Sequence, residues 1–153
     1  IGEDFNFNVA AFQKAEKVIA GKRKNYYYRW DNPTSDMTKF SIKKCECGLW
    51  ALEVIKQNLM IRSDRILEAW KYANWRTYSD FYDMCVLAGV EKEYPEMYKK
   101  CLKVTQKDAL SALHVPTSKQ NKLRAVIMWI CPAAIPIAMR FRKIKYHVNV
   151  SNR

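Results

Sequence analysis

The sequence predicts a mainly α-helical protein, in which a short β-hairpin-like portion near the N-terminus is followed by a multi-helix bundle. From Thr38 onward, apolar residues recur at helical spacing, and prolines and capping residues divide that region into successive segments. The residues that favour β-structure are concentrated in one aromatic run, Asn25–Trp30. Sequential helices with short links are typical of a helical bundle.

The first expected helix covers about residues 4–15. Phe5, Val9 and Phe12 are spaced at i, i+4 and i+7, which places them on one side of an amphipathic helix. The acidic pair Glu3-Asp4 then falls in the first helical turn. Carboxylates there face unpaired backbone N–H groups and the positive end of the helix dipole, which favours their ionised form. Such acidic starts are also common in helices without any catalytic role.

Two short strands are expected next, Lys17–Ala20 and Asn25–Trp30, with the basic turn Gly21–Lys24 between them. The following segment, Asp31–Ser35, is rich in turn residues, and an asparagine before proline is disfavoured in the helical region. Two short strands do not form a stable sheet on their own, so we expect them to complete a larger sheet.

Four capping signals divide the central region. A helix is expected over about residues 40–60, and Ser63-Asp64 caps the next one. Thr77–Asp80 has the spacing of a capping box and predicts a new helix start, with Gly89 as the stop. Pro95 suits the first turn of a further helix that extends toward Leu113.

Two final helices are expected after a break at Val115–Ser118, one over residues 122–131 and one over about 133–145. Pro132 separates them and can begin the last helix. The sequence contains no run of 18 apolar residues, so no transmembrane helix is predicted.

The positive charge is concentrated in the last third of the chain. The formal net charge is +12; residues 97–153 carry 12 Lys and Arg against the single acid Asp108, whereas residues 1–96 carry 15 Lys and Arg against 14 Asp and Glu. This asymmetry indicates an anionic partner, for which phospholipid head groups, nucleic acid and sugar phosphates are the alternatives.

The five cysteines favour reduced, partly buried thiols in a cytosolic protein. Cys45 and Cys47 are separated by one residue, whereas zinc knuckles use two or more, and no second ligand pair accompanies them. We therefore expect no metal site built from the cysteines and histidines. Asp80 and Asp83 are expected to be solvated side chains on a helix.

Two stretches of the chain resemble a known family. The first combines Gly2-Glu3-Asp4-Phe5 at a helix start with the Tyr26-Tyr27-Tyr28-Arg29 strand and a turn that contains Ser35. The second runs from Lys122-Leu123-Arg124-Ala125 through Cys131-Pro132 to Arg140-Phe141-Arg142. Together these stretches, residues 1–42 and about 119–145, resemble the C-terminal part of family 2 nucleotide-sugar glycosyltransferases with the GT-A fold.

The resemblance implies that the chain is the C-terminal fragment of an α/β GT-A enzyme. Residues 1–40 would end the catalytic domain, 41–118 would form a helical region, and 119–153 would form a basic C-terminal helical hairpin. Family members place the nucleotide site and an Asp-x-Asp metal pair before the Glu-Asp helix, and no Asp-x-Asp occurs in this sequence. We therefore expect a nucleotide-sugar donor and a divalent metal only in the full-length enzyme, and no turnover by this chain alone.

The resemblance also implies catalytic residues. In an inverting transfer, a carboxylate accepts the proton of the attacking hydroxyl, and the match assigns this role to Asp4. Glu3 would orient the acceptor or Asp4 itself.

Three further residues are candidates for substrate binding: Arg29, Trp30 and Ser35. A guanidinium binds phosphate oxygens in a bidentate fork, so Arg29 together with the turn at Ser35 could meet the donor diphosphate. Arg29 could equally form a surface ion pair with Asp31 or Asp36. Trp30 could stack on a sugar ring or belong to the core.

The C-terminal region is expected to contact a membrane surface. Residues 125–139 are apolar apart from interruptions at Pro132 and Pro136, and four cations follow. Such a segment suits an amphipathic hairpin lying in the interface, or alternatively a buried helix pair with a basic exposed face. The expected membrane contacts are Trp129, Arg140, Arg142, Lys143 and Lys145.

The functional expectation is an acceptor-side part of an inverting glycosyltransferase, which transfers sugar to a glycan or lipid-linked acceptor in cell-surface polysaccharide synthesis. We expect it to be cytoplasmic and peripheral at the inner face of the membrane. The alternatives are a basic helical module that binds nucleic acid and a non-catalytic helical interaction domain. Nucleic acid is the less favoured partner, because the aromatic run and the basic region lie in separate thirds of the chain.

Overall fold

The computed structural model describes residues 3–19, 21–22 and 40–141. These residues are mainly helical and contain no β-strand. The chain divides into two compact units, Ile1–Ile61 and Arg62–Arg153. The predicted predominance of helices is confirmed.

The expected N-terminal β-hairpin is not seen. Residues 17–19, predicted to form its first strand, have no regular secondary structure and are exposed. The second predicted strand, Asn25–Trp30, lies outside the described residues. A strand needs a hydrogen-bonded neighbour, and the described part of the chain offers residues 17–19 none.

The first unit contains α1 (Glu3–Lys14) and α2 (Ile42–Gln57), which contact each other. The buried face of α2 is formed by residues spaced three or four apart, as expected of an amphipathic helix: Cys45, Leu49, Leu52 and Ile55. The end of α2 is tied to α1 by Gln13, whose side chain donates to the Asn58 carbonyl (3.3 Å) and accepts from the Met60 amide (2.7 Å).

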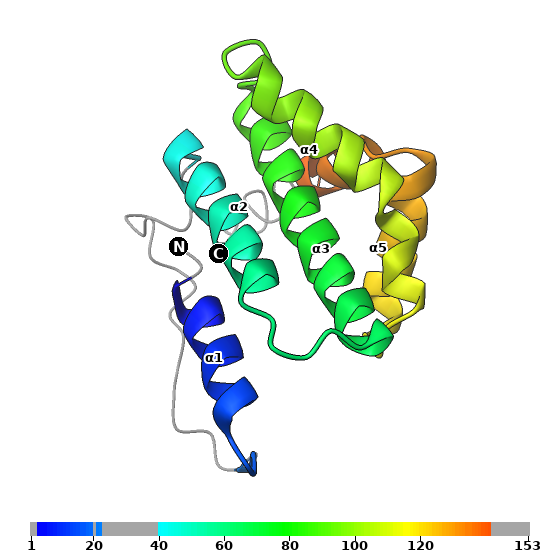
Figure 1. Cartoon of the computed structure of the whole chain (residues 1–153). Coiled ribbons are helices and arrows are strands. Elements are labelled where there is room, and N and C mark those ends of the chain that lie inside the picture. The colour runs from blue at the N-terminus through cyan, green and yellow to red at the C-terminus, as the bar shows by residue number, and fades with distance from the viewer. Residues whose placement is uncertain (1–2, 20, 23–39, 142–153) are drawn as a thin grey trace, which may run out of the picture. The chain divides into compact units, whose positions relative to one another are not determined.

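The second unit is built around α3 (Asp64–Ala88), which forms a hairpin with α4 (Pro95–Lys107), as Figure 1 shows. Gly89 ends α3 in the left-handed conformation (φ 71°), and its amide bonds back to the last turn. Pro95 opens α4 in a first-turn position that requires no N–H donor. The end of α3 and the start of α4 are therefore where the sequence predicts them.

One predicted helix boundary is wrong. Thr77, expected to cap a new helix, lies in the middle of α3, which is continuous from Asp64 to Ala88. The Thr77 hydroxyl donates instead to the Ala73 carbonyl one turn earlier (3.0 Å). A threonine hydroxyl satisfied in this way allows the helix to continue.

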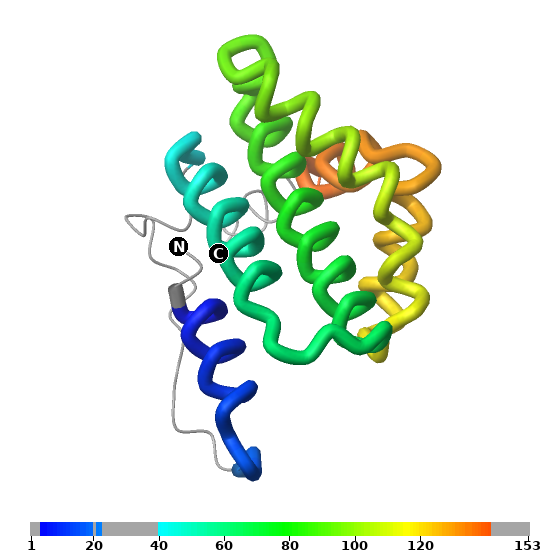
Figure 2. Tube along the Cα trace, viewed as in Figure 1, coloured from blue at the N-terminus to red at the C-terminus, as the bar shows by residue number. Residues whose placement is uncertain are grey.

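The remaining elements of the second unit pack on this hairpin. They are the 3₁₀-helix η1 (Ala109–Leu113), α5 (Lys119–Ile130) and a helical segment, Ala134–Phe141, that is bent by 119° from α5. Figure 2 shows the chain reversing after α5. The Ser118 side chain caps α5 by accepting from the Asn121 amide.

The core of the second unit joins α3, α4, η1 and α5. Trp75 is fully buried, and its indole N–H donates to the Thr105 carbonyl on α4 (3.0 Å). The small or flexible side chains of η1 and α5 allow close packing at the other side of this core. Those that are completely buried are Ala109, Ala112, Ala125 and Met128.

Candidate functional site

The predicted catalytic pair lies at the start of α1. The helix begins at Glu3, and the Asp4 side chain is exposed in the first turn. Asp4 is therefore accessible to a molecule that approaches the N-terminal end of α1.

The side of α1 that faces α2 differs from the predicted apolar stripe. Asn6, Val9 and Gln13 are the half-buried residues, and their spacing of three and four places them on one face. Phe5 and Phe12 of the predicted stripe are 44% and 59% exposed, and Phe7 is 73% exposed. α1 thus turns mostly polar side chains toward α2 and leaves its phenylalanines uncovered.

A pocket of about 260 Å³ lies between α1 and the C-terminal end of α2. α1 contributes Asn6, Val9 and Gln13 among others, and Ile55 and Asn58 are on the opposite wall. Asp4 does not line this pocket, because residues two apart lie on opposite sides of a helix. Its amide side chains and apolar floor are compatible with a hydroxylated ligand.

The three predicted substrate-binding residues, Arg29, Trp30 and Ser35, lie outside the described residues. Their expected contacts with the donor diphosphate and the sugar stay predictions.

Two of the five predicted membrane contacts lie in the described part of the chain. Trp129 is 53% exposed near the end of α5, and the exposed Arg140 donates a hydrogen bond to the Val86 carbonyl. Arg142, Lys143 and Lys145 lie outside the described residues. Several apolar residues of α5 and of the segment that follows it are also exposed: Leu123, Ile130, Ile137, Met139 and Phe141.

Within the described ranges, no helix has by itself the length and apolar composition needed to cross a membrane. α5 and the segment Ala134–Phe141 reach that length and composition only when taken together, across their 119° bend.

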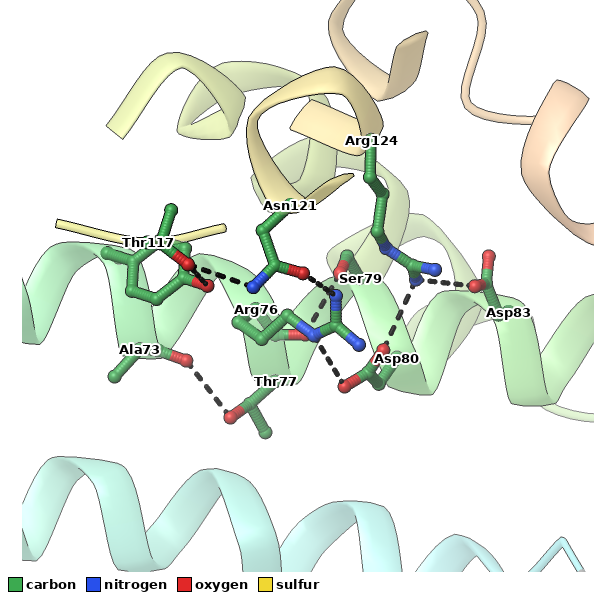
Figure 3. Close-up of polar contacts among 10 residues, drawn as sticks. Ala73, Arg76, Thr77, Ser79, Asp80, Asp83, Thr117, Asn121 and Arg124 are labelled. Carbon is green, nitrogen blue, oxygen red and sulfur yellow. Dashed lines mark hydrogen bonds and ion pairs between the residues drawn. The ribbon is translucent and has the colours of Figure 1, made fainter. Parts of the chain in front are cut away.

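A cluster of polar side chains joins α3 to α5, as Figure 3 shows. The Arg124 guanidinium of α5 donates to Asp83 (2.6 Å) and to Asp80 (3.2 Å), both on α3. Asp80 also accepts from Arg76 one turn earlier (3.0 Å). The Arg124 and Asp83 side chains are only 16% and 5% exposed. A largely buried, charge-assisted contact therefore holds the two helices together.

Further hydrogen bonds continue this cluster toward the start of α5. Arg76 donates to the Asn121 side-chain oxygen (3.4 Å), and the Asn121 side-chain amide donates to the Thr117 hydroxyl (2.9 Å). The Tyr72 and Thr117 hydroxyls are 3.0 Å apart. The cluster thus fixes α5 on α3 at several points along both helices.

Asp83 was expected to be solvated, and this prediction is wrong. The aspartate is buried because it lies on the side of α3 that Arg124 covers, which the spacing of Asp80 and Asp83 could not reveal. Arg124 precedes the fully buried Ala125 and lies three residues after Asn121. This position of Arg124, beside the apolar stripe of α5, is the sequence signal that could have indicated a buried acidic partner.

Burial raises the pKa of Asp83 from 3.8 to about 6, although the Arg124 guanidinium acts in the opposite direction. The folded protein therefore binds a proton at Asp83 more readily than the unfolded chain does. The contribution of Asp83 to the free energy of unfolding is therefore largest below about pH 4. It decreases as the pH rises through about 6, by about 3 kcal/mol in total.

We expect Asp83→Asn to remove this component of the pH dependence. Denaturant unfolding of the wild type and the variant between pH 4 and 7 measures it, because the other carboxylates contribute equally to both proteins. The free energy of unfolding of the wild type, minus that of Asp83→Asn, should be larger at pH 4 than at pH 7. A constant difference across the range would contradict the raised pKa.

Within the described residues, no three His, Cys, Asp or Glu side chains are grouped as they would be around a metal ion. The five cysteines are reduced, and Cys45, Cys85 and Cys101 are buried. The chain matches no protein-family model, no curated protein and no solved structure in the comparisons with known proteins.

Proposed function

We propose that this chain is the C-terminal, acceptor-side part of an inverting glycosyltransferase that uses a nucleotide-sugar donor. The observation that carries the proposal is the Asp4 carboxylate, which is exposed in the first turn of α1 directly after Gly2-Glu3. The Glu-Asp start and the Tyr26–Arg29 run resemble family 2 enzymes with the GT-A fold. The acceptor would be a glycan or a lipid-linked sugar of a cell-surface polysaccharide.

In this proposal Asp4 accepts the proton of the acceptor hydroxyl while that oxygen bonds to the anomeric carbon of the donor sugar. The bond from the anomeric carbon to the nucleoside diphosphate breaks on the opposite face, so the anomeric configuration inverts. A general base must be ionised and within hydrogen-bond reach of the hydroxyl. Glu3 would orient the acceptor or Asp4, and a divalent metal would be held by the donor-binding half.

The exposed phenylalanines of α1 support this proposal. Phe7 and Phe12 are 73% and 59% exposed, and Val18 and Ile19 beyond the helix are 59% and 79% exposed. Groups of uncovered apolar side chains are typical of surfaces that contact another protein segment. A donor-binding half packed on α1 and the residues after it would cover them.

A turnover assay tests the proposal. We expect the full-length enzyme to release a nucleoside diphosphate from one member of a panel of nucleotide sugars when a glycan acceptor and a divalent metal are present. The 153-residue chain should release none, because the proposal places the donor-binding half outside it. Failure of the folded full-length enzyme to turn over any nucleotide sugar, or to bind one, would contradict the proposal.

We further propose that the end of α5 and the segment that follows it lie in the interface of an anionic membrane. Trp129, Ile130 and Phe141 are 53%, 70% and 69% exposed. Tryptophan and phenylalanine favour the interface between lipid and water, and nearby cations are attracted to anionic head groups. This arrangement would place the enzyme beside a lipid-linked acceptor.

Flotation with phosphatidylglycerol-containing vesicles at low salt tests the membrane contact. We expect the chain to float with these vesicles and Trp129→Ser to reduce the floated fraction several-fold. Trp50→Ser is the matched control, because Trp50 is a similarly exposed tryptophan (68%) on α2. Equal loss in both variants, or no flotation of the wild type, would contradict the proposed contact.

A further inference from the structure

The exposed side of α4 carries a row of lysines. α4 packs along α3 (Figure 1), and its two buried residues, Cys101 and Thr105, are four apart and lie on one side of the helix. The opposite side carries the exposed residues of the helix: Pro95, Glu96, Lys99, Lys100, Lys103, Gln106 and Lys107. Because the four lysines among them are spaced three or four apart, they form one continuous surface, which we call the α4 lysine row.

Carboxylates offset only a small part of this charge. Lys99 Nζ is 4.0 Å from Glu96 Oε1, but both side chains are largely exposed, so this ion pair is weak. Asp108, directly after the helix, pairs with Lys71 of α3 instead (3.9 Å). The four lysines and Glu96 therefore leave the exposed side of α4 with a net charge of +3.

The lysines are evenly spaced along the helix. With a rise of about 1.5 Å per residue, Lys99, Lys103 and Lys107 follow one another at intervals of about 6 Å, and the helix keeps the row straight. A small anion would meet one or two hydrated ammonium groups, whose attraction is screened by salt. A polyanion meets the whole row at once, and each neutralised charge on it releases bound counterions.

The other exposed residues of α4 indicate which polyanion the row suits. A helix that lies in a membrane interface needs an apolar face toward the lipid. None of the large apolar residues of α4 is among its exposed residues. The surface at the end of α5 is different, because Trp129 and Ile130 are exposed there. The α4 lysine row therefore suits a hydrophilic polyanion better than a lipid surface.

We propose that the α4 lysine row binds the sugar–phosphate backbone of a nucleic-acid duplex. Lysine contacts a phosphate as a point charge, and such contacts carry no sequence information. Binding of this kind needs no aromatic side chains on which bases stack. The row shares no residue with the proposed transferase site, and the inference does not depend on that activity.

The salt dependence of duplex binding tests this inference. Each phosphate contact adds about −0.9 to the slope of log K against log salt concentration, so four lysines predict a slope of about −3.6. Fluorescence anisotropy of a short, labelled DNA duplex measures it. We expect the affinity to fall about 100-fold between roughly 50 and 200 mM salt, and a duplex of unrelated sequence to bind equally well. No binding at the lower salt concentration would overturn the proposal.

The double variant Lys103→Gln/Lys107→Gln then tests the location of the contact. We expect it to bind the duplex at least tenfold more weakly at about 50 mM salt and to reduce the steepness of the slope by about 2. Glutamine forms helices about as well as lysine, so α4 should be retained. Lys14→Gln/Lys43→Gln is the matched control, because it removes the same charge from exposed positions of α1 and α2. Equal losses in the two double variants would overturn the assignment to α4.

Vesicle flotation separates a nucleic acid from a membrane as the partner of the row. With phosphatidylglycerol-containing vesicles at low salt, we expect Lys103→Gln/Lys107→Gln to float as the wild type does. A loss of flotation at least as large as the loss of duplex binding would assign the row to an anionic membrane surface and would overturn the proposal.

Discussion

In the glycosyltransferase proposed above, replacing Asp4 with asparagine is expected to lower the rate of sugar transfer by about 100- to 10,000-fold, the range typical for loss of a general base. Asparagine has nearly the same shape as aspartate and is also accepted near helix starts, so α1 should form normally. Its amide cannot take the proton of the acceptor hydroxyl. The measurement is the rate of nucleoside diphosphate release at saturating donor and acceptor.

The control for this variant is Asp64→Asn. Asp64 is likewise an exposed acidic residue in the first turn of a helix, at the start of α3. Both substitutions remove one favourable interaction with a helix dipole, so any general effect on stability should be similar. Transfer by Asp4→Asn within a few-fold of the wild type would contradict the role of Asp4 as the base.

Replacing Arg124 with methionine is expected to lower the free energy of unfolding by about 3–5 kcal/mol at neutral pH, the usual cost of removing one partner of a buried ion pair. Arg124 contacts Asp83 at 2.6 Å and Asp80 at 3.2 Å, and its side chain is only 16% exposed. Without the guanidinium, Asp83 would be a buried carboxylate without its principal counter-ion. Denaturant unfolding at pH 7 measures the change.

Two further variants distinguish this mechanism from a general loss of packing. Adding Asp83→Asn to Arg124→Met should recover part of the lost stability, because no unpaired charge is then buried. Arg65→Met, at an exposed position of α3, should change the free energy of unfolding by less than about 0.5 kcal/mol. A small effect of Arg124→Met, or no recovery in the double variant, would contradict the importance of the α3–α5 ion pair.

The helices were predictable because their signals are local. Gly89 and Pro95 act through backbone geometry within a few residues, so they mark the end of α3 and the start of α4 correctly. The helix start predicted at Thr77 was wrong, because a threonine hydroxyl can either cap a helix or donate to the carbonyl four residues earlier. The predicted strand Lys17–Ala20 does not form at its described residues, 17–19, because strand formation depends on a neighbouring strand and not on local preference alone.

Burial was predicted less well, because it depends on which helices meet. The spacing of Phe5, Val9 and Phe12 correctly indicates one side of a helix, but it cannot show whether that side faces α2 or is left uncovered. Asp83 is hidden by Arg124, which is 41 residues away in sequence. In the candidate catalytic region, the position of Asp4 at a helix start was predictable from the sequence; its contacts with a sugar stay a prediction.

The stereochemistry of transfer tests the central claim most directly. Proton NMR of a reaction with the full-length enzyme follows the anomeric signal of the donor and that of the first product formed. We expect the product to have the anomeric configuration opposite to that of the donor, and we expect Asp4→Asn to form almost no product in the same time. A product that retains the donor configuration, or one formed as quickly by the variant, would contradict a single displacement assisted by Asp4.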